Sequence, residues 1–323
     1  MLLQNLPLTS INIADDSFRI TFAPELGTLK TSIEAVGLTQ PIHVRHTPEG
    51  TYQIVSGYKR ILVLRELSRQ TVTALVSEQQ DLTPAKAFLL NLHENAIIRT
   101  LNPVEKALAL QKLPLYIQAS EEELVTRYLP LLGEEPSYRV LHQLTSLNNL
   151  TEPIKQHLVT TDMALSSAAR IAEFTPSTQQ ALLSVLQHIR PSAAKLNELL
   201  TLIREIAARD ALSVEDILQR YQLLTLVADP NTPHAERIRA LRQTLRGIRL
   251  PNLTERQEKV ASLIQSLDLP AAAKVVADPY FENEKIKLEY QFSHPEELDA
   301  FIKKLQGAFA LQQWQQIFEW YRV

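Results

Sequence analysis

The sequence predicts an α+β protein, with a small mixed α/β domain at the amino-terminal end, an all-helical middle, and a small domain of a β-hairpin and helices at the carboxyl-terminal end. Three observations predict this class. Seven glycines among 323 residues are too few for β-sandwiches or propellers, which use glycine in their many turns. Residues that favour helices, above all Leu, Ala, Gln and Glu, dominate the chain from about 83 to 269. Alternating strand patterns occur only toward the two ends.

The composition also excludes several classes of site. Apolar residues make up 45% and charged residues 21% of the chain, as in folded globular proteins. The absence of cysteine excludes disulfides, thiolate metal sites and cysteine nucleophiles. No stretch resembles a membrane span of about 20 apolar residues, and the start, MLLQNLPLTS, lacks the basic region of a signal peptide. We therefore expect a cytoplasmic protein without a membrane partner.

The first hundred residues combine short strands and helices. In chain order we expect a helix at 29–36, strands at 41–45 and 52–55, a helix at 58–68 and a strand at 71–76. The second strand runs into Ser56 and Gly57, and a helix follows at once. The first amides of a helix have no partner within the helix, so this strand, glycine turn and helix start form a natural anion site.

The middle of the chain contains a pair of helices joined by a short turn. Ser120 followed by Glu123 predicts a capping box that opens the first helix. Gly133 ends that helix, and Pro136 is expected at the first position of the second. This is the helix-turn-helix pattern, with residues 137–147 in the place of the recognition helix. Further helices are expected to begin near Pro153, Leu165, Ser177, Pro191 and Ser213.

Charge is not concentrated in any one segment. Residues 116–190 contain five Lys and Arg against eight Asp and Glu, so DNA binding would depend on local basic patches. The best such patch outside the helix-turn-helix is a helical stripe of Arg239, Arg242, Arg246 and Arg249, which suits either a phosphate track or a solvated face.

The last segment returns to strand periodicity. Residues 285–292 alternate strictly, which predicts a strand with one buried face, and residues 274–277 complete a hairpin with it. Helices are expected at 295–309 and 311–321. The aromatic residues of the last helix suit either a core or a two-fold interface; they are Trp314, Phe318, Trp320 and Tyr321.

Three stretches in this order resemble the ParB proteins of bacterial chromosome and plasmid partition. They are GLTQPI at 37–42 leading into IVSGYKR at 54–60, Glu94-Asn95 followed by LNPVEKA at 101–107, and the helix-turn-helix. The alternating strand with Ser293, Glu296, Glu297, Leu298 and Leu305 is similar to the ParB dimerisation unit. The resemblance divides the chain into a ParB/sulfiredoxin-like nucleotide-binding domain (1–115), a DNA-binding domain (116–190), a helical extension (191–250) and a dimerisation domain (251–323).

The resemblance implies a CTP-dependent clamp that closes as a homodimer around double-stranded DNA, associated with the nucleoid. It also implies a ParA-type ATPase as partner, although the family's docking segment is basic and residues 1–18 contain no Lys or Arg. By resemblance, Gly57, Tyr58, Lys59 and Arg60 hold the triphosphate, while Glu94 and Asn95 hold Mg²⁺ and phosphate oxygens. Arg99 stands one place later than the family's arginine.

The departures from the family pattern concern the chemistry of that site. The family has Gln and Arg where this chain has Ile97 and Ile98, an acidic residue at Tyr58, and an arginine at Leu62. We therefore expect CTP·Mg²⁺ binding with weak or lost hydrolysis. The alternative for 57–60 is an ordinary strand-to-helix turn with solvated cations, and for Glu94 and Asn95 it is helix capping.

Direct reading of DNA would fall to side chains that suit base edges and phosphates, which are Ser137, Tyr138, Arg139, His142 and Gln143. Arg170 lies where the family carries an arginine on a later helix. The alternative is a helix in an acidic bundle, with Glu134 and Glu135 repelling phosphate. Two rival functions follow: a ParB-related transcription or nucleoid regulator that has lost the nucleotide switch, and an ATP- or ADP-dependent kinase on the same amino-terminal fold.

Overall fold

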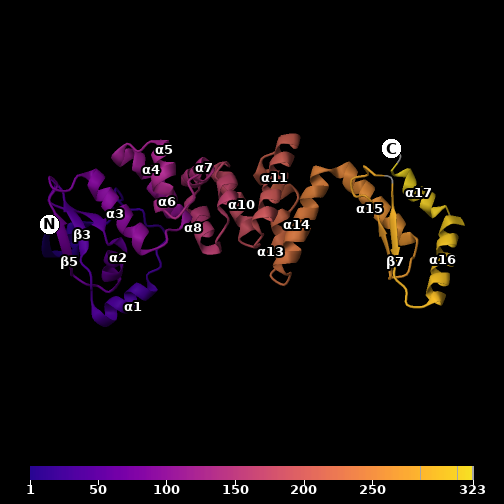
Figure 1. The fold of residues 1–323 in the computed structure, drawn as a ribbon, viewed down its shortest axis with the longest axis horizontal. Coiled ribbons are helices and arrows are strands. Elements are labelled where there is room, and N and C mark those ends of the chain that lie inside the picture. The colour runs from indigo at the N-terminus through magenta and orange to yellow at the C-terminus, as the bar shows by residue number, and fades with distance from the viewer. Residues whose placement is uncertain (284, 311, 322–323) are drawn as a thin grey trace. The chain divides into compact units, whose positions relative to one another are not determined.

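The computed structural model describes residues 1–283, 285–310 and 312–321 (Figure 1). It divides into two compact units, Met1–Leu200 and Thr201–Val323. The predicted α+β class is confirmed, with a sheet domain first, helices in the middle and a hairpin with helices last. None of the helices in the described part of the chain has the length and apolarity that crossing a bilayer requires. The sequence-based boundaries at 115, 190 and 250 stay predictions.

The amino-terminal domain is built on a five-stranded sheet in the order β1-β5-β3-β4-β2. Its strands are β1 (Leu2–Pro7), β2 (Ile11–Asn12), β3 (Ile42–His46), β4 (Tyr52–Ser56) and β5 (Thr71–Ser77). The pairs β3·β5 and β2·β4 are parallel, and β1·β5 and β3·β4 are antiparallel. β3, β4 and β5 were expected from the sequence, whereas the two edge strands were not.

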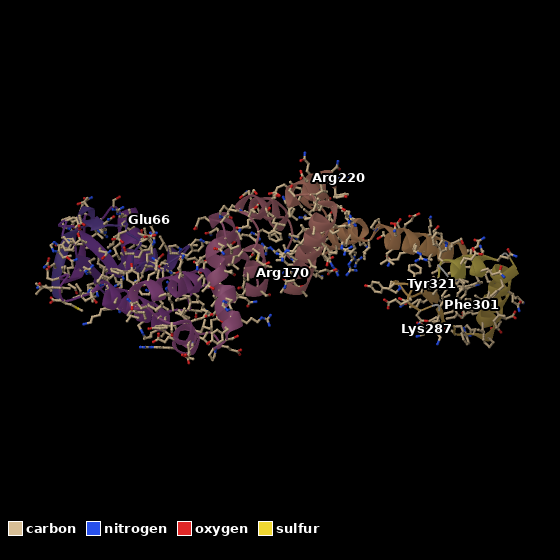
Figure 2. All side chains as sticks on the ribbon, turned by 90° about the horizontal axis from the view of Figure 1, so that it is seen from above. Glu66, Arg170, Arg220, Lys287, Phe301 and Tyr321 are labelled. Atoms are coloured by element: carbon tan, nitrogen blue, oxygen red, sulfur yellow. The ribbon has the colours of Figure 1, made fainter. Side chains whose placement is uncertain are left out.

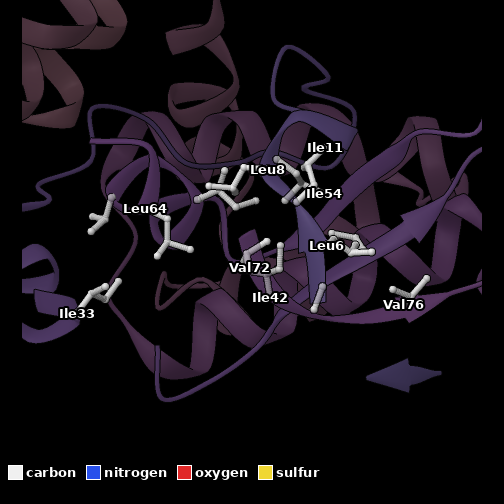
Figure 3. Close-up of a cluster of buried hydrophobic side chains, with 13 residues drawn as sticks. Leu6, Leu8, Ile11, Ile33, Ile42, Ile54, Leu64, Val72 and Val76 are labelled. Atoms are coloured by element: carbon white, nitrogen blue, oxygen red, sulfur yellow. The ribbon is translucent and has the colours of Figure 1, made fainter. Parts of the chain in front are cut away.

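Two helices complete the core of this domain. They are α1 (Gly27–Val36) and α2 (Tyr58–Glu66), which contact each other. Their buried side chains meet the aliphatic residues of the strands, as Figure 3 shows for Ile33, Leu64, Ile42 and Val72. β3 and β5 contribute alternate residues to the cluster, as the period of a strand requires. The core fixes the end of β4 and the start of α2, where the candidate site lies.

Two further helices follow the sheet, α3 (Pro84–Ile98) and α4 (Pro103–Ile117). α3 packs on β4, and the buried Asn91 donates from its amide Nδ2 to the carbonyl of Val55 at 2.5 Å. α4 opens with a capping box, in which Asn102 and Glu105 each bond the other's backbone amide. The end of α3 is therefore held at the end of β4, and α4 follows it directly.

The predicted helix pair is present in the helical middle. The first helix is continuous through α5 (Glu121–Glu123), η2 (Leu124–Tyr128) and α6 (Leu129–Leu131), and its capping box at Ser120 is confirmed. The second is α7 (Tyr138–Ser146). The expected place of Pro136 at its first position is wrong: Ser137, which has extended backbone angles, is the N-cap, so the proline precedes the helix. The remaining helical elements of the region are η3 (Leu147–Asn149), α8 (Glu152–Thr161), α9 (Leu165–Ile171), α10 (Pro176–Leu186) and α11 (Ala193–Asp210).

The second unit combines helices with the predicted hairpin. Its elements are α12 (Val214–Arg220), α13 (Leu223–Ala228), α14 (His234–Arg249), α15 (Pro251–Ser266), β6 (Ala273–Val276), β7 (Lys287–Tyr290), α16 (Pro295–Ala310) and α17 (Gln313–Glu319). β6 and β7 are antiparallel, and the Tyr290 ring stacks on Phe301 of α16 with centroids 3.9 Å apart. Trp314 and Tyr321 are buried in the core of this unit, where Figure 2 labels Tyr321. Leu311, where the last helix was expected to begin, lies outside the described residues.

Candidate functional site

A cavity of about 260 Å³ opens at the amino-terminal end of α2. Its walls come from the segment 21–40, the first turn of α2 and the last turns of α3. The structure brings together here every residue that the sequence assigned to a nucleotide site, namely Gly57, Tyr58, Lys59, Arg60, Glu94, Asn95 and Arg99.

Gly57 shapes the entrance to α2. Its φ of 97° lies in the left-handed region, and a Cβ there would lie 2.7 Å from Cγ2 of Ile42. Only glycine therefore fits this turn without strain. The first helical bond runs from Ile61 N to Gly57 O, so the amides of Tyr58, Lys59 and Arg60 precede it, and no described side chain caps them. These amides, together with the helix dipole, favour an anion at this point.

The guanidinium of Arg60 is engaged in hydrogen bonds within the protein. Its Nη1 donates to the carbonyls of Gln40 at 3.0 Å and Pro41 at 2.7 Å, and its Nη2 lies 3.5 Å from Oε1 of Glu94. Burial lowers the pKa of Arg60, and the charge of Glu94 acts in the opposite direction. The guanidinium thus joins the turn before β3 to α2 and α3, so it holds the wall of the cavity.

The guanidinium of Arg99 is only partly engaged in contacts within the protein. Its Nε donates to Oδ1 of Asn95 at 3.1 Å, and its Nη1 lies 2.5 Å from Oε2 of Glu105. Glu105 is 1% exposed and also accepts from the amides of Phe22 and Asn102. The remaining nitrogen of Arg99, Nη2, is buried without a hydrogen-bond partner among the described residues. A buried cationic donor without a partner is costly, so a ligand that meets it gains affinity.

Lys59 adds a second cation to the same wall. Burial lowers the pKa of its ammonium group, and the positive charge of Arg99 lowers it further, against the opposing effect of Glu105 and Glu25. The cavity lining contains three cations, Lys59, Arg60 and Arg99, against one carboxylate, Glu94. The pocket is therefore electropositive.

Of the two expected metal ligands, Asn95 is already engaged on both polar atoms of its side chain. Asn95 donates from Nδ2 to the carbonyl of Asn91 at 2.9 Å, and its Oδ1 is occupied by Arg99. No group of three or more His, Cys, Asp or Glu side chains suited to a metal occurs among the described residues. The residues present fit Mg²⁺ only in the way the ion is commonly bound, through one carboxylate, here Glu94, with phosphate and water oxygens completing its shell.

Sequence reasoning missed two residues that hold this site. Arg19 donates to the hydroxyl of Tyr58 at 3.1 Å, and its guanidinium carbon lies 5.0 Å from the centre of the tyrosine ring. Glu105 orients Arg99. No local pattern indicated that its carboxylate would both cap α4 and reach the pocket arginine.

The candidate DNA-contacting residues of the helix-turn-helix lie on α7. Leu141 and Leu144 are buried, whereas Tyr138, Arg139 and His142 are exposed. The other two members, Ser137 and Gln143, are half-buried. The helix is therefore anchored by its apolar face and presents polar side chains to solvent.

Two charged residues near α7 have other partners. Glu134, which was expected to repel phosphate, pairs with Lys106 Nζ at 2.6 Å. Arg170 of α9, which Figure 2 labels, is half-buried, and its Nη1 donates to the carbonyl of Asn197 at 2.9 Å. Arg170 thus joins α9 to α11, and the structure does not bring it into one exposed group with the α7 residues.

Comparison with known proteins adds the family context. Residues 2–96 match the model of the ParB N-terminal domain. A probable chromosome-partitioning protein ParB of Vibrio cholerae is 26% identical over 208 residues, which are 64% of this chain and 67% of that protein. The ParB of Myxococcus xanthus is 35% identical over 133 residues, which are 41% of this chain and 42% of that protein. The matched segment thus spans between about two fifths and two thirds of these relatives.

Solved structures give similar matches. A truncated ParB of Caulobacter crescentus complexed with CTP-γ-S is 26% identical, covering 57% of this chain and 97% of that one with a TM-score of 0.28. The same protein complexed to the centromeric parS site is 21% identical, covering 67% and 99% with a TM-score of 0.34. From the sequence matches, the chain contains a ParB N-terminal domain and is a distant homologue of the chromosome-partitioning ParB proteins.

Proposed function

We propose that this protein is a DNA-binding partition protein of the ParB type whose amino-terminal pocket binds CTP as its Mg²⁺ complex, and that bound nucleotide favours closure of two copies around DNA. The observation that supports nucleotide binding most directly is the buried, unpartnered Nη2 of Arg99 beside the uncapped amides of α2.

The phosphate-binding step rests on three kinds of donor around one cavity. The amides of Tyr58, Lys59 and Arg60 supply the helix terminus, Lys59 supplies an ammonium group, and Arg99 supplies Nη2. An anion offsets the mutual repulsion of Lys59 and Arg99, which is the second cause of the lowered pKa of Lys59. Several charge-assisted hydrogen bonds suit a triphosphate better than a neutral ligand.

Mg²⁺ and the cytosine base of the nucleotide are proposed on different grounds. Bound Mg²⁺ would offset phosphate charge, and Glu94 is the carboxylate placed to hold it. CTP is proposed because the motifs around the pocket resemble those of ParB proteins and residues 2–96 match the ParB N-terminal domain. Hydrolysis is expected to be weak, because Ile97 and Ile98 stand where the family has polar side chains.

Coupling to DNA is proposed through Arg99 and Glu105. Arg99 ends α3 at the pocket, Glu105 lies in the first turn of α4, and α4 packs against α7. A ligand that bonds to Arg99 alters the Arg99–Glu105 ion pair, which joins the pocket to α4. Such a ligand shifts the population of conformations only if it binds the closed state more tightly than the open one.

DNA, a second copy of the chain and a ParA-type ATPase are proposed as partners from the resemblance to ParB proteins. The exposed side chains of α7 contact duplex DNA, the segment 251–323 forms the dimer, and a ParA-type ATPase acts with the complex. A second candidate function is a regulator without the nucleotide switch. It is favoured by Ile97 and Ile98, which are 78% and 70% exposed beside Arg99 and offer a phosphate no donor.

Calorimetric titration with CTP, ATP and ADP in the presence of Mg²⁺ tests the proposal. We expect CTP to bind most tightly, and Arg99→Ala and Lys59→Ala each to weaken it by about tenfold or more, the usual effect of losing a charged hydrogen bond. Arg65→Ala is the matched control, since it removes an exposed cation from the last turn of the same helix. Equal affinities in all four proteins would contradict the assigned site, and preference for ATP or ADP would favour the kinase.

A further inference from the structure

A second cavity, of about 210 Å³, lies in the helical middle where α11 begins. The end of α8, the following loop, α9 and the connection from α10 to α11 form its walls. The larger apolar side chains of these walls are Met163, Leu186, Ile189 and Leu196. None of the residues assigned above to nucleotide or DNA lines this cavity, so it requires a separate explanation.

Ser167 of α9 is the buried polar group of this cavity. It is 0% exposed, and its Oγ has no hydrogen-bond partner among the described residues. Buried hydroxyls are nearly always paired, because an unpaired one loses the hydrogen bonds that it made to water. One turn later on the same helix, Arg170 donates to the carbonyl of Asn197, which holds α9 against α11. Ser167 lines the same cavity as the start of α11.

The first turn of α11 supplies backbone donors. The first helical bond runs from Leu196 N to Ser192 O at 2.9 Å, so the amides of residues 193–195 precede it. α11 extends over 18 residues, and Ser192 and Ala193 line the cavity. The amino-terminal end of such a helix carries a partial positive charge.

The charged groups of the lining favour an anion. Arg190, an exposed residue directly before Pro191, lines the cavity and is the cation of its lining. Burial lowers the pKa of His157, and the charge of Arg190 lowers it further, so the imidazole is neutral near pH 7. Asp162, the one acidic residue among the described residues that line this cavity, is exposed to solvent, as Arg190 is. Arg190 is thus the cation that lines the cavity together with the first-turn amides of α11 and the hydroxyl of Ser167.

We propose that this cavity binds the oxyanion group of a small molecule, a phosphate or a carboxylate, through Arg190, the first-turn amides of α11 and the hydroxyl of Ser167. The apolar side chains of the walls accommodate a short aliphatic body. The site is independent of the nucleotide pocket and of the α7 surface.

The test is titration of the full chain with sodium phosphate and with sodium butyrate at constant ionic strength, sodium chloride serving as reference. The readouts are the amide resonances of residues 193–195 and the midpoint of thermal unfolding. We expect saturable shifts with at least one oxyanion and none with chloride. Arg190→Gln and Ser167→Ala should each weaken binding by about tenfold or more. Lys195→Gln, which removes an exposed cation from the same turn without touching the lining, should leave it unchanged.

Ser167→Ala also gives a readout that a merely structural serine would not. Because it removes an unpaired buried hydroxyl, the variant should unfold no earlier than wild type without anion, yet lose the stabilisation by phosphate or butyrate. Lack of saturation, equal shifts with chloride, or wild-type affinity in either variant would overturn the proposal. Shifts of these resonances with duplex DNA alone would overturn it too, since they would assign the surface to the DNA backbone.

Discussion

The guanidinium of Arg99 and the carboxylate of Glu105 form an ion pair of 2.5 Å that joins the wall of the nucleotide pocket to the first turn of α4. The same carboxylate accepts from the amides of Phe22 and Asn102, so three segments of the chain meet at one buried oxygen pair. Arg99 therefore has both a structural partner and an unused donor.

These two roles of Arg99 can be separated by changing Glu105. Glu105→Gln removes the charge and keeps an acceptor for only one of the two amides, because the carboxamide nitrogen cannot accept, so we expect a loss of about 1.5–3 kcal/mol in the free energy of unfolding, measured with urea. Nucleotide affinity should persist, because the cation stays in the pocket. Arg99→Ala should lower both the free energy of unfolding and the affinity for nucleotide. Loss of nucleotide binding by folded Glu105→Gln would show that Arg99 acts only through this pair.

Gly57 and Gly37 provide a matched test of the turn before α2. Both have positive φ, but a Cβ at Gly37 meets nothing within 4 Å, whereas one at Gly57 meets Ile42. Gly37→Ala should cost about 1–2 kcal/mol of stability for the left-handed backbone alone. Gly57→Ala should cost about 1–3 kcal/mol more for the overpacking. Equal losses in urea unfolding would contradict the close approach to Ile42.

Arg139 and Arg170 should differ in what they affect. Arg139 is exposed on α7, so Arg139→Gln should weaken DNA binding by about 1–3 kcal/mol for a base contact, or lower the salt slope by about one for a phosphate contact, without changing stability. Arg170→Gln should mainly lower the thermal midpoint, because it breaks the bond to Asn197. Fluorescence anisotropy on a duplex selected from a random pool, with Lys195→Gln as charge control, measures the first effect. Unchanged affinity in Arg139→Gln would contradict the α7 interface.

The buried His43 should make the stability of the fold depend on pH. Its Nε2 lies 2.8 Å from Oγ of Ser77, with both residues buried. Burial lowers the pKa of His43 below its ordinary value of 6.5, against an opposing effect of Glu94. The unfolded chain therefore takes up this proton first, and stability is full above pH 6.5 and falls as the pH drops below it.

Thermal unfolding between pH 5 and 8 measures this effect. His43→Gln should flatten the acid side of the curve, and His157→Gln should remove a further part, since burial lowers the pKa of His157 as well. A curve for the His43 variant that parallels wild type throughout would contradict the assignment.

Deletion of residues 250–323 tests the proposed dimerisation segment. The described part of this segment exposes aromatic side chains, with Tyr280 and Phe309 each 62% exposed. Exposed aromatic groups of this kind are typical of interfaces. The remaining chain should be monomeric by light scattering, with the full chain dimeric. A dimer that persists after the deletion would place the interface elsewhere.

The sequence predicted those elements that local patterns determine. Gly57, the alternation of 52–55 and the capping residue Ser120 each act through neighbours within a few positions. The edge strand β1 was missed because LLQNLP alternates poorly and depends on pairing with β5, about 70 residues away.

The pocket was predictable as a set of residues but not as a set of contacts. Arg60 bonds carbonyls about 20 residues earlier in the chain, and Arg19 reaches Tyr58 across 39 residues. Nothing local distinguishes an arginine that will bond the backbone, such as Arg60, from one that retains a donor, such as Arg99. Those orientations are set by tertiary packing.

Calorimetric titration of CTP·Mg²⁺ into wild type and Arg99→Ala, with and without DNA, is the most direct test of the central claim. We expect saturable CTP binding to wild type, tighter than that of ATP or ADP, and a loss of affinity of about tenfold or more in the variant. Absence of nucleotide binding to wild type, even with DNA present, would contradict it.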